Sequence, residues 1–204
     1  MLEKITWFGH ASVRIKSEKT IYIDPWKIRV GEKADLILIT HSHYDHLSPA
    51  DVKKLQKKET VVLATADCLP QLSGDVRAVK PGDRLSLFGI NVEVVPSYNL
   101  KKAFHPKSND WVGYVVTVEG TRIYYPGDTD FIPEMRDIQA DIMILPVGGT
   151  YTMDAREAAD AVNALKPKMA IPIHYGDIVG SLDDAEKFKK LAKIPVEIIP
   201  VGTS

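Results

Sequence analysis

Cysteine is nearly absent from this sequence. Cys68 is the only one among 204 residues, so no intrachain disulfide can form. A lone free cysteine is typically a small buried apolar residue, and we interpret Cys68 in that way. Long apolar runs are absent too: no stretch approaches the roughly 18 residues that a membrane helix needs, so we expect no membrane association. Without a secretory signal pattern, the expected compartment is the reducing cytoplasm.

An excess of charge of either sign is also missing. The chain has 26 basic and 27 acidic residues, which gives a formal net charge of -1. A protein without a basic excess lacks the electrostatic footprint typical of nucleic-acid binding. We therefore expect a small-molecule substrate and no nucleic acid, and we leave a homo-oligomer open.

The chain contains an internal repeat. Trp7 and Asp24 are separated by 17 positions, and so are Trp111 and Asp128. Each aspartate ends an apolar run, and each is followed by a second, similar run, then a helical pattern, then a third run. The two second runs are ADLILIT at 34–40 and ADIMILP at 140–146. This order predicts a duplicated β-β-α-β half within one domain, residues 1–204.

The fold class follows from the pattern of helices and strands. Ser48 followed by Pro49, Asp154 followed by Glu157, and a third cap at Ser181 predict three helices. Some strand-like runs are continuously apolar, as in strands covered on both faces, and others alternate or form hairpins. An α/β (α+β) arrangement, with two mixed β-sheets and helices on their outer faces, would bury all of these surfaces.

The stretch THSHYDH holds three of the six histidines of the chain. It follows an apolar strand and precedes the Ser48 cap, so His41, His43, Asp45 and His46 lie in a loop at the end of a strand. Four such groups without a cation would be poorly paired or would repel one another. Imidazole and carboxylate ligands together predict one or two divalent ions, zinc first, with manganese or iron as alternatives.

These residues resemble the signature of the metallo-β-lactamase superfamily, H-x-H-x-D-H. The resemblance extends to Asp24 in IDP, Asp128 in PGDT and His174 in PIHY, and therefore covers most of the chain. It implies an αββα sandwich with an internal pseudo-two-fold repeat. The pieces WFGHAS, YYPGDTD, LPVGG and YTM look most similar to a small single-domain branch that includes an ascorbate-6-phosphate lactonase.

The resemblance also implies roles for individual residues. The implied ligands are His41 and His43 for a first ion, Asp45, His46 and His174 for a second, and Asp128 as the bridge between them. Asp45 would in addition be catalytic, because it can orient or deprotonate the attacking water. Asp24 would brace the ligand loop through hydrogen bonds without touching metal.

One position departs from the family pattern. The family usually has another histidine for the first ion after a strand like that at residues 92–95, but this chain has Pro-Ser-Tyr-Asn there. His105 is the only histidine in the interval. It could bind metal, contact substrate or merely close its loop, and spacing across a loop does not decide between these.

Substrate contacts are predicted more loosely. Lys101 and Lys102, with Asn99, lie in the loop expected to overhang the site and could hold an anionic group. His10 corresponds in the repeat to Tyr114, which favours a packing or supporting part, with substrate contact as the alternative.

The predicted function is metal-dependent hydrolysis of an ester, lactone or phosphoester bond in a small, anionic substrate. A metal-binding module or sensor without turnover is the alternative. A nuclease is a weaker one, because the chain has no room for an added RNA-gripping domain. Redox chemistry at a di-iron site is weaker still.

Overall fold

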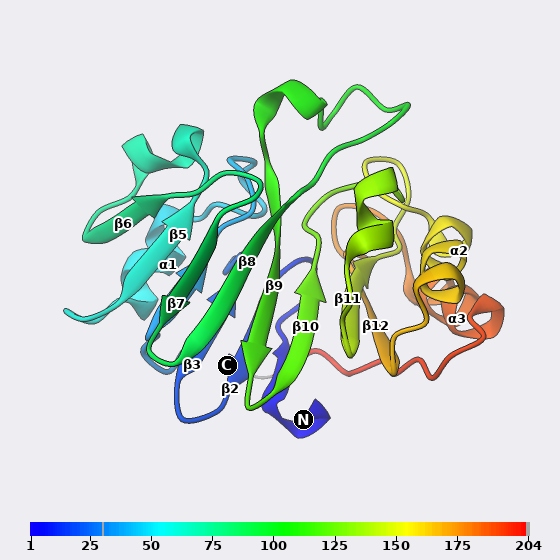
Figure 1. The fold of residues 1–204 in the computed structure, drawn as a ribbon, viewed down its shortest axis with the longest axis horizontal. Coiled ribbons are helices and arrows are strands. Elements are labelled where there is room, and N and C mark those ends of the chain that lie inside the picture. The colour runs from blue at the N-terminus through cyan, green and yellow to red at the C-terminus, as the bar shows by residue number, and fades with distance from the viewer. Residues whose placement is uncertain (30, 203–204) are drawn as a thin grey trace.

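A computed structural model describes residues 1–29 and 31–202 of the chain. Two six-stranded mixed sheets face each other, and helices cover their outer sides (Figure 1). The predicted fold class, an αββα sandwich, is therefore confirmed. Within the described residues, no helix is long and apolar enough to cross a membrane.

The first sheet is built from the N-terminal part of the chain, with its strands in sequence order. Its strands are β1 (Ile5–Trp7), β2 (Val13–Lys16), β3 (Thr20–Ile23), β4 (Leu36–Leu38), β5 (Val61–Ala64) and β6 (Asp75–Ala78). Strands β1 to β3 pair antiparallel, and β3 to β6 pair parallel. The predicted hairpin turn after Lys16 joins β2 to β3.

The second sheet repeats this plan. Its strands are β7 (Arg84–Leu87), β8 (Ile90–Pro96), β9 (Val112–Val118), β10 (Thr121–Tyr125), β11 (Ile142–Pro146) and β12 (Met169–Ile173). Strands β7 to β10 pair antiparallel, whereas β10, β11 and β12 pair parallel. The order β3-β4-helix-β5 thus recurs as β10-β11-helix-β12, which confirms the predicted repeat.

The three α-helices begin where the caps predicted. They are α1 (Pro49–Leu55), α2 (Ala155–Leu165) and α3 (Leu182–Leu191). The Ser48 side chain accepts the Asp51 amide, and Asp154 with Glu157 forms a capping box. Short 3-10 helices lie at Leu2–Lys4, Ala66–Gln71, Lys107–Asn109 and Pro133–Asp137.

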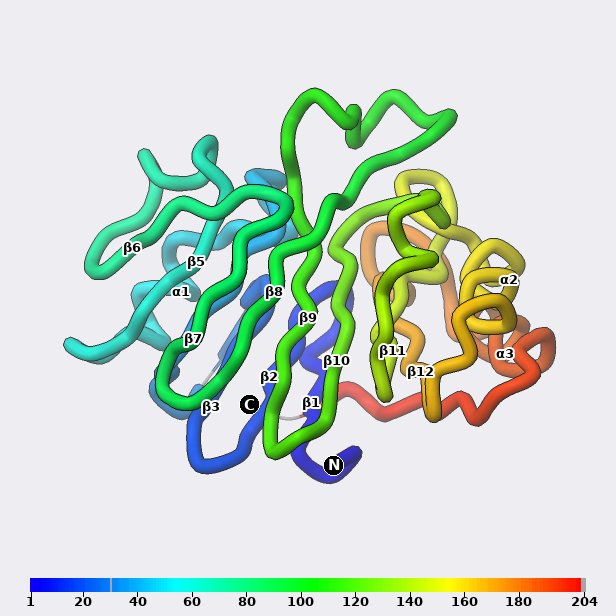
Figure 2. The backbone as a smooth tube through the Cα atoms, in the orientation of Figure 1, coloured from blue at the N-terminus to red at the C-terminus, as the bar shows by residue number. Residues whose placement is uncertain are grey.

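The core follows the alternation of the strands. In β3, Ile21 and Ile23 face the space between the sheets, while Tyr22 faces outward, where Val52 and Leu55 of α1 cover it. The continuously apolar runs are therefore buried on both faces, as their composition predicted. This rigid sandwich carries the loops at one end of the parallel strands. The loop at residues 97–111, between β8 and β9, rises clear of the sheets (Figure 2).

Candidate metal centre

All six histidines of the chain meet in one place. The histidine-rich loop follows β4, Asp128 follows β10, His174 follows β12, and His105 comes from the loop at residues 97–111. The carboxyl ends of parallel strands are the usual position of sites in sheets of this kind. Segments far apart in the chain therefore converge, as the predicted centre requires.

The first group of side chains consists of His41, His43 and His105. His43 Nδ1 lies 3.1 Å from His41 Nε2 and 3.2 Å from His105 Nε2. The segment from Asn99 to His105 forms a closed turn, because the backbone N–H of Asn99 donates to the backbone carbonyl of His105 at 2.7 Å. The loop thus brings His105 next to His41 and His43. The family pattern has a histidine for this group directly after the strand, where this chain has Pro-Ser-Tyr-Asn.

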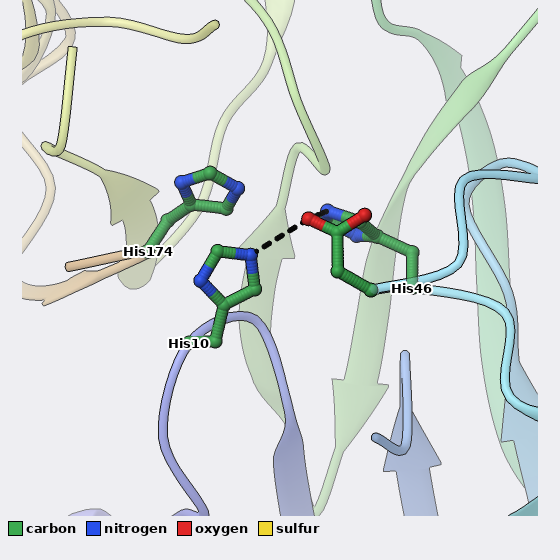
Figure 3. A group of neighbouring side chains, drawn as sticks. His10, His46 and His174 are labelled. Atoms are coloured by element: carbon green, nitrogen blue, oxygen red, sulfur yellow. Dashed lines mark hydrogen bonds and ion pairs between the residues drawn. The ribbon is translucent and has the colours of Figure 1, made fainter. Parts of the chain in front are cut away.

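The second group consists of His10, Asp45, His46 and His174, which come from three separate loops (Figure 3). Asp128 lies between the two groups. Its Oδ1 is 3.2 Å from His46 Nε2 and 3.2 Å from His174 Nε2, and its Oδ2 is 3.3 Å from His105 Nε2. One carboxylate oxygen thus faces each group, as the bridging position implied by the resemblance requires.

The polar atoms at the centre are not satisfied by one another. His46 Nε2, Asp128 Oδ1 and both ring nitrogens of His174 are buried and make no hydrogen bond with the described residues. A buried polar group without a partner costs about 1–3 kcal/mol, and here several such atoms point at one another. Imidazole nitrogens and carboxylate oxygens are typical ligands of divalent cations. The side chains therefore fit a metal centre.

Neighbouring groups fix the tautomers of the histidines. The Thr40 hydroxyl donates to Asp24 at 2.7 Å, so its oxygen accepts from His41 Nδ1–H at 2.9 Å. His46 Nδ1 donates to Asp24 at 2.8 Å. His105 Nδ1 donates to Asn99 Oδ1 at 2.8 Å. In each case Nε2 keeps its lone pair and faces the centre, which is how metal-binding histidines are usually oriented.

Asp24 lies where the resemblance placed it. Its Oδ1 accepts the Thr40 amide at 2.8 Å, and its Oδ2 accepts from Thr40, from His46 and, at 3.2 Å, from Tyr125. The carboxylate is fully buried. It braces both His41, through Thr40, and His46.

The charges favour the metal-binding forms of His41, His43 and Asp128, but not that of His46. Burial lowers the pKa of His41 well below its usual range, and burial together with His105 lowers that of His43, so both imidazoles are neutral. Burial opposes ionisation of Asp128, but the charges of His174 and His46 hold its pKa well below the usual range. Burial also lowers the pKa of His46, but Asp128 and Asp24 outweigh it and raise the pKa well above its usual value.

In the loop at residues 97–111, the side chains expected to hold an anion contact other protein groups. Asn99 is buried. Its side-chain nitrogen donates to Asp130 at 3.1 Å, and its side-chain oxygen accepts from His105, so Asn99 orients a histidine. Lys102 forms an ion pair with Asp130 and lies 3.5 Å from Glu157. With Lys101 it lines a surface hollow of about 560 Å³ rich in acidic side chains. These contacts remove the geometric basis for the predicted anion clamp.

Two tryptophans at the centre were not foreseen as part of it. The Trp111 ring lies 4.8 Å from the rings of both His41 and His43, and its Nε1 donates to Asp67 at 2.8 Å. Trp7 Nε1 donates to the His10 carbonyl at 2.8 Å. The signal was present in the sequence, because the repeat aligns these two residues.

Comparison with known proteins agrees with the fold and the motif. A family model described as a β-lactamase superfamily domain matches residues 4–174. A metal-dependent hydrolase of Thermoplasma acidophilum is 35% identical, and the match covers 93% of this chain and 90% of that protein. A metal-dependent hydrolase of Aeropyrum pernix is 34% identical, with 93% and 89% covered.

Solved structures give the same result. A Parabacteroides distasonis protein considered to be a metal-dependent hydrolase superposes with a TM-score of 0.85 and 34% identity, covering 95% of this chain and 91% of that one. A metallo hydrolase of Ignicoccus hospitalis shares the fold, with a TM-score of 0.79 at 23% identity, covering 97% and 95%. The chain therefore belongs to the β-lactamase superfamily, which confirms the family and the enzyme class that its histidine-rich motif predicted.

Proposed function

We propose that this protein hydrolyses an ester, lactone or phosphoester bond of a small molecule at a centre that holds two divalent ions. The observation that carries the proposal is that two separate groups of histidines meet at Asp128, where Asp128 Oδ1 and the facing nitrogens of His46 and His174 are buried without a hydrogen-bond partner among the described residues. A site with ligands on both sides of one carboxylate is suited to a pair of ions.

The chain would hold the ions with seven side chains. His41, His43 and His105 would hold the first, Asp45, His46 and His174 the second, and Asp128 both. When bound, such ions supply Lewis acidity, which lowers the pKa of water and polarises the oxygen of the bond to be cleaved. Zinc suits these ligands best, and manganese or iron would also fit.

Asp45 is the acidic side chain of the centre that is open to solvent, with 13% of it exposed, against 4% for Asp128. Burial opposes its ionisation, but the hydrogen bond from His10 and the charge of His46 keep its pKa below the usual range. Asp45 is therefore a carboxylate at neutral pH. Its Oδ1, which His10 leaves free, can orient a water and receive its proton.

The rim of the centre carries apolar side chains. Tyr44, which is 68% exposed, is part of the histidine-rich loop, and Phe104, which is 49% exposed, directly precedes His105. Ile178, which is 44% exposed, directly follows the residue whose carbonyl contacts His10. Exposed apolar groups around a polar centre are typical of ligand-binding surfaces. We therefore propose a substrate with an apolar group beside the scissile bond, in place of the anionic one expected from the sequence.

A substrate panel with defined metals tests this function. Metal-free protein would be loaded with Zn²⁺, Mn²⁺ or Fe²⁺ and assayed with aryl esters of increasing acyl length, lactones, phosphodiesters and phosphomonoesters. Lactones belong in the panel because of the resemblance to the lactonase branch. We expect turnover that increases with the apolar area of the substrate and is lost in Asp45→Asn. The exposed Asp110→Asn variant is the matched control and should retain activity.

The alternative reading has a distinct outcome. If the protein takes up both ions and yet hydrolyses no member of the panel with any metal, the binding module or sensor without turnover would be favoured. Activity confined to phosphomonoesters or other strongly anionic substrates would contradict the apolar rim and restore the earlier expectation.

A further inference from the structure

His10 lies at the turn between β1 and β2 in an unusual backbone conformation. Its φ of 47° is in the left-handed region, which most residues with a side chain avoid. Two contacts hold the main chain there. The His10 carbonyl accepts Trp7 Nε1 at 2.8 Å and the His174 amide at 2.8 Å. The turn is thus fixed to the strand before it and to the end of β12.

The ring of His10 is fixed as firmly as its backbone. Nε2 donates to Asp45 Oδ2 at 2.9 Å (Figure 3), and Nδ1 lies 3.0 Å from the Asp177 carbonyl oxygen. The His174 ring packs against it with centroids 4.0 Å apart, and the ring is 1% exposed. A side chain held at both nitrogens and on one face cannot turn away from Asp45.

Asp45 depends on this contact. Among residues 1–29 and 31–202, His10 makes the only hydrogen bond to the Asp45 carboxylate. His46 and His105 have supports of their own, Asp24 and Asn99 respectively. Burial of His10 also excludes the substrate contact that the sequence left open.

We infer that His10 is a positioning residue: it holds Asp45 Oδ2, which lies 3.8 Å from His46 Nε2, and so keeps the Asp45 carboxylate beside the second group of metal-binding side chains. The inference rests on the proposed two-ion function. It assigns a role in support of the centre to the histidine of the GHAS turn, which lies outside the ligand motif.

The test compares three substitutions at one position. His10→Ala removes the ring. His10→Gly removes it as well but accepts the left-handed backbone without strain. His10→Gln replaces the ring with a side chain whose amide nitrogen can reach the place of Nε2 and donate to Asp45. Folding of each variant would be checked by thermal unfolding, so that loss of the ring is separated from loss of the fold.

The main readout is zinc binding to metal-free protein, by calorimetry and by metal analysis after dialysis, and it needs no substrate. We expect His10→Ala and His10→Gly to bind the second ion about 10–100-fold more weakly, the usual effect of removing a group that supports a ligand. The first ion should bind normally. His10→Gln should recover most of the lost affinity. With any substrate from the panel, kcat should fall in His10→Ala while KM stays constant.

Two results would overturn the inference. One is wild-type affinity for both ions in folded His10→Ala and His10→Gly. The other is a folded His10→Gln variant as defective as His10→Ala, because the ring would then act other than by donating to Asp45. Absence of turnover in the wild-type protein would count against the proposed function alone, since the zinc affinities would still decide the role of His10.

Discussion

Asp24 and Asp128 match in the spacing of the sequence repeat, each after the corresponding strand of its half, and differ in what surrounds them. Asp24 directly follows β3, and Asp128 is the third residue after β10. Asp24 accepts four hydrogen bonds, whereas Asp128 Oδ1 accepts none from the described residues. Both carboxylates lie just beyond corresponding strands, and the hydrogen-bond donors nearby decide which carboxylate supports the site and which one faces the unpartnered histidine nitrogens.

The difference arises from the segment next to each aspartate. Thr40, which precedes the histidine-rich loop, supplies two donors to Asp24. The corresponding residue in the second half is Pro146, the last residue of β11, because ADIMILP has proline where ADLILIT has threonine. Proline has neither an amide hydrogen nor a hydroxyl to donate. The half that lacks these donors therefore leaves its aspartate free for a cation.

Replacing Asp128 should have the largest effect. Asp128→Ala removes the oxygens that face both groups of histidines, so we expect loss of metal uptake and activity at the background of the metal-free protein. Metal analysis and the substrate panel measure this. Retention of both ions by Asp128→Ala would show that the two aspartates do not differ in the way described.

Replacing Asp24 should have an intermediate effect. Asp24→Asn keeps the shape but gives up acceptor capacity, which leaves His46 Nδ1 or Thr40 without a full partner. We expect metal affinity to fall about 10–100-fold and the free energy of unfolding to fall by about 1–3 kcal/mol. Chelator competition and urea unfolding measure the two. Loss of metal with unchanged stability would mean that Asp24 acts as a ligand.

Metal binding should release a proton from His46. In the metal-free protein, Asp128 and Asp24 outweigh burial and raise the pKa of His46 well above 6.5. Protonated His46 thus stabilises the metal-free fold. This contribution is fully present below pH 6.5 and is lost as the pH rises through the raised pKa of the folded state. A metal needs the neutral ring.

Calorimetry in two buffers of different ionisation enthalpy measures this release. We expect the apparent zinc affinity to increase with pH around neutrality, and the release to shrink in Asp24→Asn. A heat of binding that does not depend on the buffer would contradict the prediction.

The two tryptophans should give the smallest effects and separate the two ions. Trp111→Phe removes the donor to Asp67 beside His41 and His43, and Trp7→Phe removes a donor to the His10 carbonyl. We expect each to weaken one ion by a few-fold, the first ion for Trp111 and the second for Trp7. Zinc titration of the two variants side by side is the measurement. Identical effects on both ions would argue against separate supports.

Much of the fold was accessible before the structure, because it depends on local chemistry. The caps at Ser48 and Asp154 satisfy helix amides within three residues, and the two apolar runs after the aspartates mark strands covered on both faces. The resemblance supplied the ligand set. The partners of Lys102 and Asn99, Asp130 and His105, were not predicted, because the tertiary fold brings them together.

The sequence by itself determined the family, the repeat and the residues able to bind a metal, because residue type and spacing settle those properties. Only the tertiary structure decided that His105 joins His41 and His43, that His10 supports Asp45, and that the rim is apolar. Each of these depends on where a loop returns in space. Many backbone paths connect the same two strand ends, and long-range packing and hydrogen bonds select the one that the chain adopts.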